Sequence, residues 1–166
     1  MDYPENCQLP GLIVPQVVFS APQPYARRES IRFTENGRPG ILLRHACSEN
    51  FSGMADRATY PTLTTTSMKI TIRINWPGYP PWAQQMHAFT HASVSEPITK
   101  QRLAYDIARL VNLFLNDMAN VQSMDRSAPG IAWSVPNIRL DDLVLLELRH
   151  VSTGSWQPVL CRMVRA

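Results

Sequence analysis

The chain has 166 residues, which is the usual size of one domain built around one core. Its 16 basic and 13 acidic residues give a net charge of +3 and are interspersed, whereas nucleic-acid-binding proteins usually gather Lys and Arg on one face. No stretch approaches the roughly 18 apolar residues that a membrane-spanning helix needs. We therefore expect neither a nucleic-acid nor a membrane partner.

The three cysteines, Cys7, Cys47 and Cys161, are odd in number and far apart, and this pattern disfavours a disulfide framework. The N-terminus does not resemble a secretory signal, because no basic residue precedes Arg27 and Pro15 interrupts the first apolar run. We expect an intracellular protein, in the cytoplasm or the nucleus.

Residues 1–30 are rich in proline and predict an extended arm whose short apolar patches lie against a single domain of residues 31–166. Directly after this arm, residues 31–34 and 41–46 flank a segment that contains Asn36 and Gly37. Both residue types can supply the positive φ that a chain reversal needs. The pattern predicts a β-hairpin over residues 31–46.

The clearest strand pattern covers residues 68–76, where apolar and polar residues alternate strictly. One face would carry the apolar set Met68, Ile70, Ile72, Ile74 and Trp76. Such alternation is typical of an antiparallel sheet with one buried and one solvated face. The proline-rich segment 77–81 ends the strand, and residues 82–89 predict a further strand.

A long amphipathic helix is predicted from Thr99 to Ala119, because apolar residues recur there at three- and four-residue spacing. Thr99 has the side chain of an N-cap, and Ile98 before it can pack on Leu103. The apolar stripe consists of Leu103, Ile107, Leu110, Val111, Phe114, Leu115 and Met118. The exposed stripe consists of Arg102, Asp106, Arg109 and Asn112.

The last third of the chain predicts an extended piece over residues 131–135 and a C-terminal hairpin of residues 143–151 and 156–164. Gly154 would take a positive φ in its turn, and Asp141 with Asp142 would open one helical turn before it. The predicted fold class is therefore α+β, with a mostly antiparallel sheet of about five or six strands and the long amphipathic helix packed on one face.

Three segments carry a resemblance to other proteins: residues 76–79 (Trp-Pro-Gly-Tyr), residues 97–104 at the start of the helix, and residues 151–158 in the C-terminal hairpin. The order of these segments and their amino-acid sequences resemble those of a group of uncharacterised small proteins predicted in fungal genomes, over roughly residues 30–160. The resemblance implies a fungal-type domain of unknown function and supplies no catalytic residues.

The histidines do not form a metal-binding motif. His87 and His91 have the i, i+4 spacing of two ligands on a helix, but a zinc site needs three or four ligands, and Ala88 stands where the zincin pattern has Glu. His45 lies two residues from Cys47. We expect ordinary surface histidines, with no bound metal and no cofactor.

Nucleophilic catalysis lacks a motif as well. Cys47 and Cys161 lie near histidines in the sequence, but cysteines of alternating strands are usually structural. Ser155 falls in an expected turn without the G-x-S-x-G pattern. Asp141 and Asp142 are adjacent and project in different directions, so a helix N-terminus explains them more simply. We assign no catalytic residue.

The most unusual feature is the aromatic and proline-rich segment with Trp76, Tyr79 and Trp82. Aromatic residues on a stiff loop suit recognition, because prolines limit the loop entropy lost on binding. We expect segment 77–81 to carry Tyr79 past the sheet edge towards a partner. The simpler alternative places Trp76 and Trp82 at the margin of the core and folds Tyr79 back over apolar surface.

These observations favour a non-enzymatic protein-interaction module that binds another protein or self-associates, with Trp76, Tyr79 and Trp82 as candidate binding residues. Two other functions remain open. A small enzyme with an unrecognised active site would show a pocket with perturbed titratable groups. A weak nucleic-acid binder would gather its arginines on one face, whereas an interaction module would expose an apolar patch or an open sheet edge.

Overall fold

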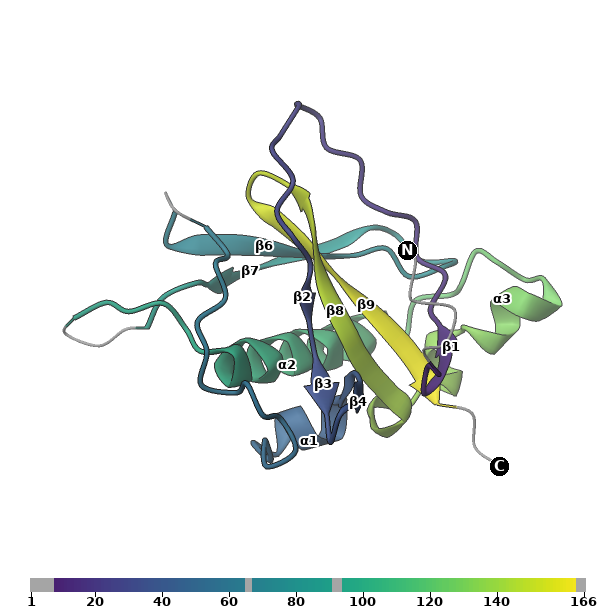
Figure 1. Cartoon of the computed structure of the whole chain (residues 1–166). Coiled ribbons are helices and arrows are strands. Elements are labelled where there is room, and N and C mark those ends of the chain that lie inside the picture. The colour runs from purple at the N-terminus through teal and green to yellow at the C-terminus, as the bar shows by residue number, and fades with distance from the viewer. Residues whose placement is uncertain (1–7, 65–66, 91–93, 164–166) are drawn as a thin grey trace.

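The computed structural model describes residues 8–64, 67–90 and 94–163. A seven-stranded sheet with the strand order β2-β8-β9-β6-β7 forms its centre, and β1 also pairs with β9 and β5 with β8 (Figure 1). The strands are β1 (Gly11–Ile13), β2 (Ile31–Arg32), β5 (Ile41–Leu42), β6 (Lys69–Ile74), β7 (Trp82–His87), β8 (Leu143–Ser152) and β9 (Ser155–Met163). All pairs are antiparallel except β6 with β9. The α+β class and the mostly antiparallel sheet are confirmed.

Helix α2 (Lys100–Met118) lies against one face of this sheet (Figure 1). Its N-terminus is capped as the sequence predicts, because the Thr99 hydroxyl accepts a hydrogen bond from the Arg102 N–H at 3.3 Å. Ile107 and Val111 are fully buried, and they share one core with the apolar face of β6. No helix in the described ranges is long and apolar enough to cross a membrane.

The predicted strand over residues 68–76 is shorter than its pattern. Ile70, Ile72 and Ile74 are buried on one face, as expected. Met68 was expected on the same face, but it precedes the first strand residue, Lys69, and 54% of it is exposed. The strand pairing therefore begins after the alternation does.

The predicted hairpin over residues 31–46 is only partly present. Asn36 and Gly37 have φ angles of 53° and 75°, and they join two-residue strands β3 (Thr34–Glu35) and β4 (Arg38–Pro39). The return strand was expected to cover residues 41–46, but β5 ends at Leu42 and helix α1 (Leu43–Cys47) follows it. Leu43 and Ala46 are its buried residues, and their three-residue spacing suits a helix and not a strand.

The expected extended piece over residues 131–135 is wrong. Helix α3 (Ala128–Ala132) covers its first two residues, because the Ser127 hydroxyl accepts a hydrogen bond from the Gly130 N–H at 3.1 Å and caps the turn. The 3₁₀ helix η1 (Val135–Asn137) follows. The single helical turn expected at the two aspartates is confirmed as η2 (Leu140–Asp142).

The C-terminal hairpin is confirmed and forms the longest strand pair, β8 with β9. Gly154 does not take the expected positive φ. The pairing instead shifts register between His150 and Ser152, so that an irregularity in the ladder accommodates the reversal.

The described part of the N-terminal arm, residues 8–30, lies against the body, as expected, and contributes β1 to the same sheet. The Gln157 side chain of β9 holds the next part of the arm. Its Oε1 accepts the Phe19 N–H at 2.9 Å, and its Nε2 donates to the Val17 carbonyl at 3.0 Å. Phe19 in turn stacks under the Arg73 guanidinium, whose carbon lies 3.9 Å from the ring centre.

Candidate functional site

The two tryptophans of the aromatic segment belong to the core. Trp76 and Trp82 each lie 5.7 Å from Phe114 of α2, measured between ring centres. Each indole N–H is satisfied internally: Trp76 donates to the Trp133 carbonyl at 2.6 Å, and Trp82 donates to the Asp117 carboxylate at 3.1 Å. Their burial is the simpler alternative that the sequence left open.

The expectation that Tyr79 projects past the sheet edge is wrong, because only 9% of it is exposed. Gly78 has a φ of 85°, and the Tyr79 N–H donates to the Trp76 carbonyl at 3.1 Å, so the segment folds back in a tight turn. The Tyr79 hydroxyl then accepts the Val135 N–H at 2.9 Å. Pro77 and Gly78 turn the ring inward.

The described histidines do not gather into a metal centre. Within the described ranges, no group of three or more His, Cys, Asp or Glu side chains could hold a metal ion. His87 is exposed on β7, and His91 lies outside the described residues. The His45 Nδ1 lies 2.7 Å from Oε2 of Glu35 and so links α1 to β3.

Cys47 and Cys161 are free thiols with suppressed acidity. Burial raises the pKa of Cys47, partly offset by the positive charge of Arg109. Burial raises the pKa of Cys161 to about 11. Because the thiolate is the nucleophile, both side chains are poorly suited to catalysis at neutral pH. His150 does not act as a general base for Cys161, since its Nδ1 accepts a hydrogen bond from the Arg28 N–H at 3.0 Å.

The polar residues of the last hairpin also have structural partners. Ser155 is buried, and its hydroxyl accepts a hydrogen bond from Nε of Arg73 at 2.9 Å. Asp142 is buried in η2, while the neighbouring Asp141 is exposed. The two carboxylates therefore lie in different environments and do not act as a pair.

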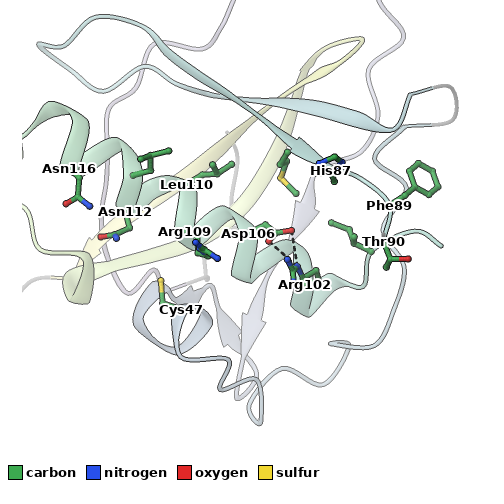
Figure 2. A pocket seen from close by; sticks show the side chains of 13 residues that line it. Cys47, His87, Phe89, Thr90, Arg102, Asp106, Arg109, Leu110, Asn112 and Asn116 are labelled. Atoms are coloured by element: carbon green, nitrogen blue, oxygen red, sulfur yellow. Dashed lines mark hydrogen bonds and ion pairs between the residues drawn. The ribbon is translucent and has the colours of Figure 1, made fainter. Parts of the chain in front are cut away.

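A groove of about 720 Å³ runs along the outward side of α2, between Cys47 at the end of α1 and the end of β7 (Figure 2). Leu110, Leu113 and Phe89 contribute apolar surface to it. The predicted exposed stripe of α2 lines the groove as well, namely Arg102, Asp106, Arg109 and Asn112. Arg102, Arg109 and Asn112 are exposed as the helical periodicity predicted, whereas Asp106 is half-buried.

The charges of the groove are unevenly paired. Nε of Arg102 lies 3.1 Å from the Asp106 carboxylate, one turn further along the helix. Burial nevertheless raises the pKa of Asp106, against the opposing effect of Arg102. Arg109 donates to the Tyr105 hydroxyl at 3.2 Å and has no salt bridge among the described residues. The Arg109 guanidinium is therefore not in salt-bridge contact with a carboxylate of the described residues, although its charge lowers the pKa of Asp106.

The outer edge of β7 adjoins this groove, and the register of β6 fixes how its backbone is oriented. Thr71 of β6 donates its N–H to Gly154 at the start of β9, so the odd-numbered residues of β6 face β9 and the even-numbered ones face β7. Ile72 pairs with Gln84, so the even-numbered residues of β7 bond to β6. The N–H and C=O groups of Ala83 and Gln85 consequently point away from the sheet.

These outward groups have no partner in the part of the chain that the structure describes, where only β6 pairs with β7. Residues 83–85 are exposed in succession. The sequence predicted a strand here but not that it lies at the edge. Its one signal is composition, since residues 82–87 contain no Lys, Arg, Asp, Glu or Pro.

Natural proteins usually protect an edge strand by making it short, charged, bulged or interrupted by proline. The opposite edge of this sheet follows that rule, because β2 and β5 have two residues each and are separated by the β3–β4 hairpin. β7 has six residues and an unbroken register with β6. It is a long edge without such protection.

No protein-family model, no curated protein and no solved structure matches the chain.

Proposed function

We propose that the protein is a non-enzymatic interaction module that binds an extended protein segment along the outer edge of β7. The observation that carries the proposal is the pair of outward backbone groups at Ala83 and Gln85, on a six-residue edge strand without protection. An added strand would pair with these groups and extend the sheet.

The groove on α2 supplies selectivity for the side chains of the bound segment. Side chains alternate between the two faces of a strand, so every second residue of an added strand faces α2. Leu113, which is 40% exposed, offers these side chains an apolar contact. Arg109 offers a guanidinium, whose N–H donors can bind a polar side chain of the segment. The preferred segment is extended, with apolar and polar residues on the face towards α2.

An enzymatic role has weaker support, although Asp106 is a titratable group with a raised pKa in a groove. Its carboxylate is already engaged by Arg102, and the raised pKa of Cys47 keeps that thiol protonated. Cys47 forms no hydrogen bond to a general base among the described side chains, so the activated nucleophile of covalent catalysis has no counterpart there.

The proposal includes an intracellular location, in the cytoplasm or the nucleus. Cys47 and Cys161 are both free thiols, which suits a reducing compartment.

The test is a selection of displayed random peptides on the immobilised protein, carried out with the wild type and with Gln85→Pro and Gln85→Ala. The Gln85 N–H points outward, so Gln85→Pro removes a donor of the edge and leaves the bonds between β6 and β7 in place. Gln85→Ala keeps that donor and serves as the matched control.

We expect the wild type and Gln85→Ala to enrich the same extended peptides and Gln85→Pro to lose them, with circular dichroism showing that all three are folded. Equal enrichment on Gln85→Pro would contradict binding at the edge of β7. A selection without any enriched peptide would contradict the binding of foreign segments.

A further inference from the structure

The edge of β7 is complementary to itself. When two identical strands pair antiparallel about a two-fold axis, a residue before the axis pairs with the residue of the other copy that lies equally far after it. With the axis at Gln84, Ala83 of each copy lies opposite Gln85 of the other. These are the two residues whose N–H and C=O groups point outward, so each donor meets an acceptor of the second copy.

The side chains agree with the same register. On the face that carries α2, Trp82 would lie opposite Met86 of the second copy, and Gln84 opposite Gln84. On the other face, Ala83 would lie opposite Gln85. On the α2 face the arrangement pairs apolar with apolar residues and amide with amide, on the other face it pairs Ala83 with an amide, and it places no like charges opposite each other.

The rest of the sheet limits the assembly to two copies. Pro81 precedes β7 and lacks an N–H, so the ladder between the copies ends there. The opposite edge consists of the two-residue strands β2 and β5 and offers no comparable surface. Pairing of the two β7 edges therefore closes the assembly instead of propagating it.

We infer that the extended segment bound by this edge is β7 of a second copy of the chain, paired antiparallel about a two-fold axis at Gln84. This inference rests on the proposed function and names its partner. The product is a symmetric dimer with one sheet continuous through both copies.

Sedimentation equilibrium over a wide concentration range, with the wild type and with Gln84→Lys and Gln84→Glu, tests the pairing. The Gln84 side chain is exposed, so both variants should keep the melting temperature of the monomer fold. Like charges opposite each other at the axis should weaken association roughly fivefold in each variant alone. An equimolar mixture of the two variants should associate more tightly than either alone, because Lys and Glu then face each other.

Two further variants make the result specific. Gln85→Pro removes an outward donor from each copy and should leave the protein monomeric. Gln122→Lys makes the same chemical change as Gln84→Lys at an exposed position outside β7, and it should associate like the wild type. A dimer that is indifferent to Gln85→Pro, or a mixture of Gln84→Lys and Gln84→Glu that does not recover association, would overturn the inference.

The wild type alone separates this inference from the proposed function. A protein that stays monomeric but selects peptides at the β7 edge refutes the second copy and keeps the interaction module. A protein that stays monomeric and selects no peptide refutes both. A dimer that is lost in Gln85→Pro supports both.

Discussion

Replacing Tyr79 with Phe should destabilise the protein, because it removes a buried hydrogen-bond acceptor without changing the shape of the ring. The Tyr79 hydroxyl accepts the N–H of Val135 at 2.9 Å, and Val135 is 4% exposed. A buried donor left without a partner costs about 1–3 kcal/mol. For a chain of this size each kcal/mol lowers the melting temperature by roughly 2–4 °C, so a fall of about 2–12 °C is expected.

Urea denaturation measures this cost most directly, since a change in midpoint at constant slope reports the free energy of unfolding. Tyr60→Phe is the matched control, because Tyr60 is 59% exposed and its loss of a hydroxyl should be nearly neutral. If the midpoint of Tyr79→Phe equals that of Tyr60→Phe, Tyr79 is not the buried acceptor described above, and its role on the surface must be reconsidered.

Three further predictions concern other buried groups. Burial lowers the pKa of His150 below its unfolded value of about 6.5, so the unfolded chain binds the proton first, and stability should fall as the pH drops below about 6.5. His150→Phe should flatten that dependence in pH-resolved urea titrations. Cys161 has a pKa of about 11 and is fully buried, so iodoacetamide should label it after Cys47, as followed by mass spectrometry. Gln157→Leu should release the arm and raise chymotrypsin cleavage at Phe19, and unchanged cleavage would contradict that anchor.

The long helix was predictable because its apolar spacing and its N-cap both lie within one continuous segment of the sequence. The spacing of Leu103, Ile107 and Val111 identified the buried side of α2, and Thr99 identified its start. The same periodicity placed Arg102 and Arg109 on the outer side, where they line the groove. A helix face depends only on local spacing, so the sequence was sufficient.

The inward turn of Tyr79 was not predictable from local rules. Pro77 and Gly78 showed correctly that the strand ends, but a turn can carry the chain either out of the sheet or back over it. The direction depends on Val135, more than fifty positions further along, whose N–H lacks a partner unless Tyr79 folds inward. The residues near Tyr79 in the sequence do not indicate that the Val135 N–H needs this acceptor.

The open edge of β7 required still more distant information. Whether Gln85 directs its N–H into or away from the sheet depends on its register with β6, and that of β6 depends on the contact between Thr71 and Gly154. A shift of one residue would turn Gln84 outward in place of Gln85 and reverse the roles of the two side chains. The edge is therefore a property of three strands together. For the same reason Gln85→Pro discriminates well, because a proline at Gln84 would remove a bond within the sheet, whereas one at Gln85 removes only a bond to the partner.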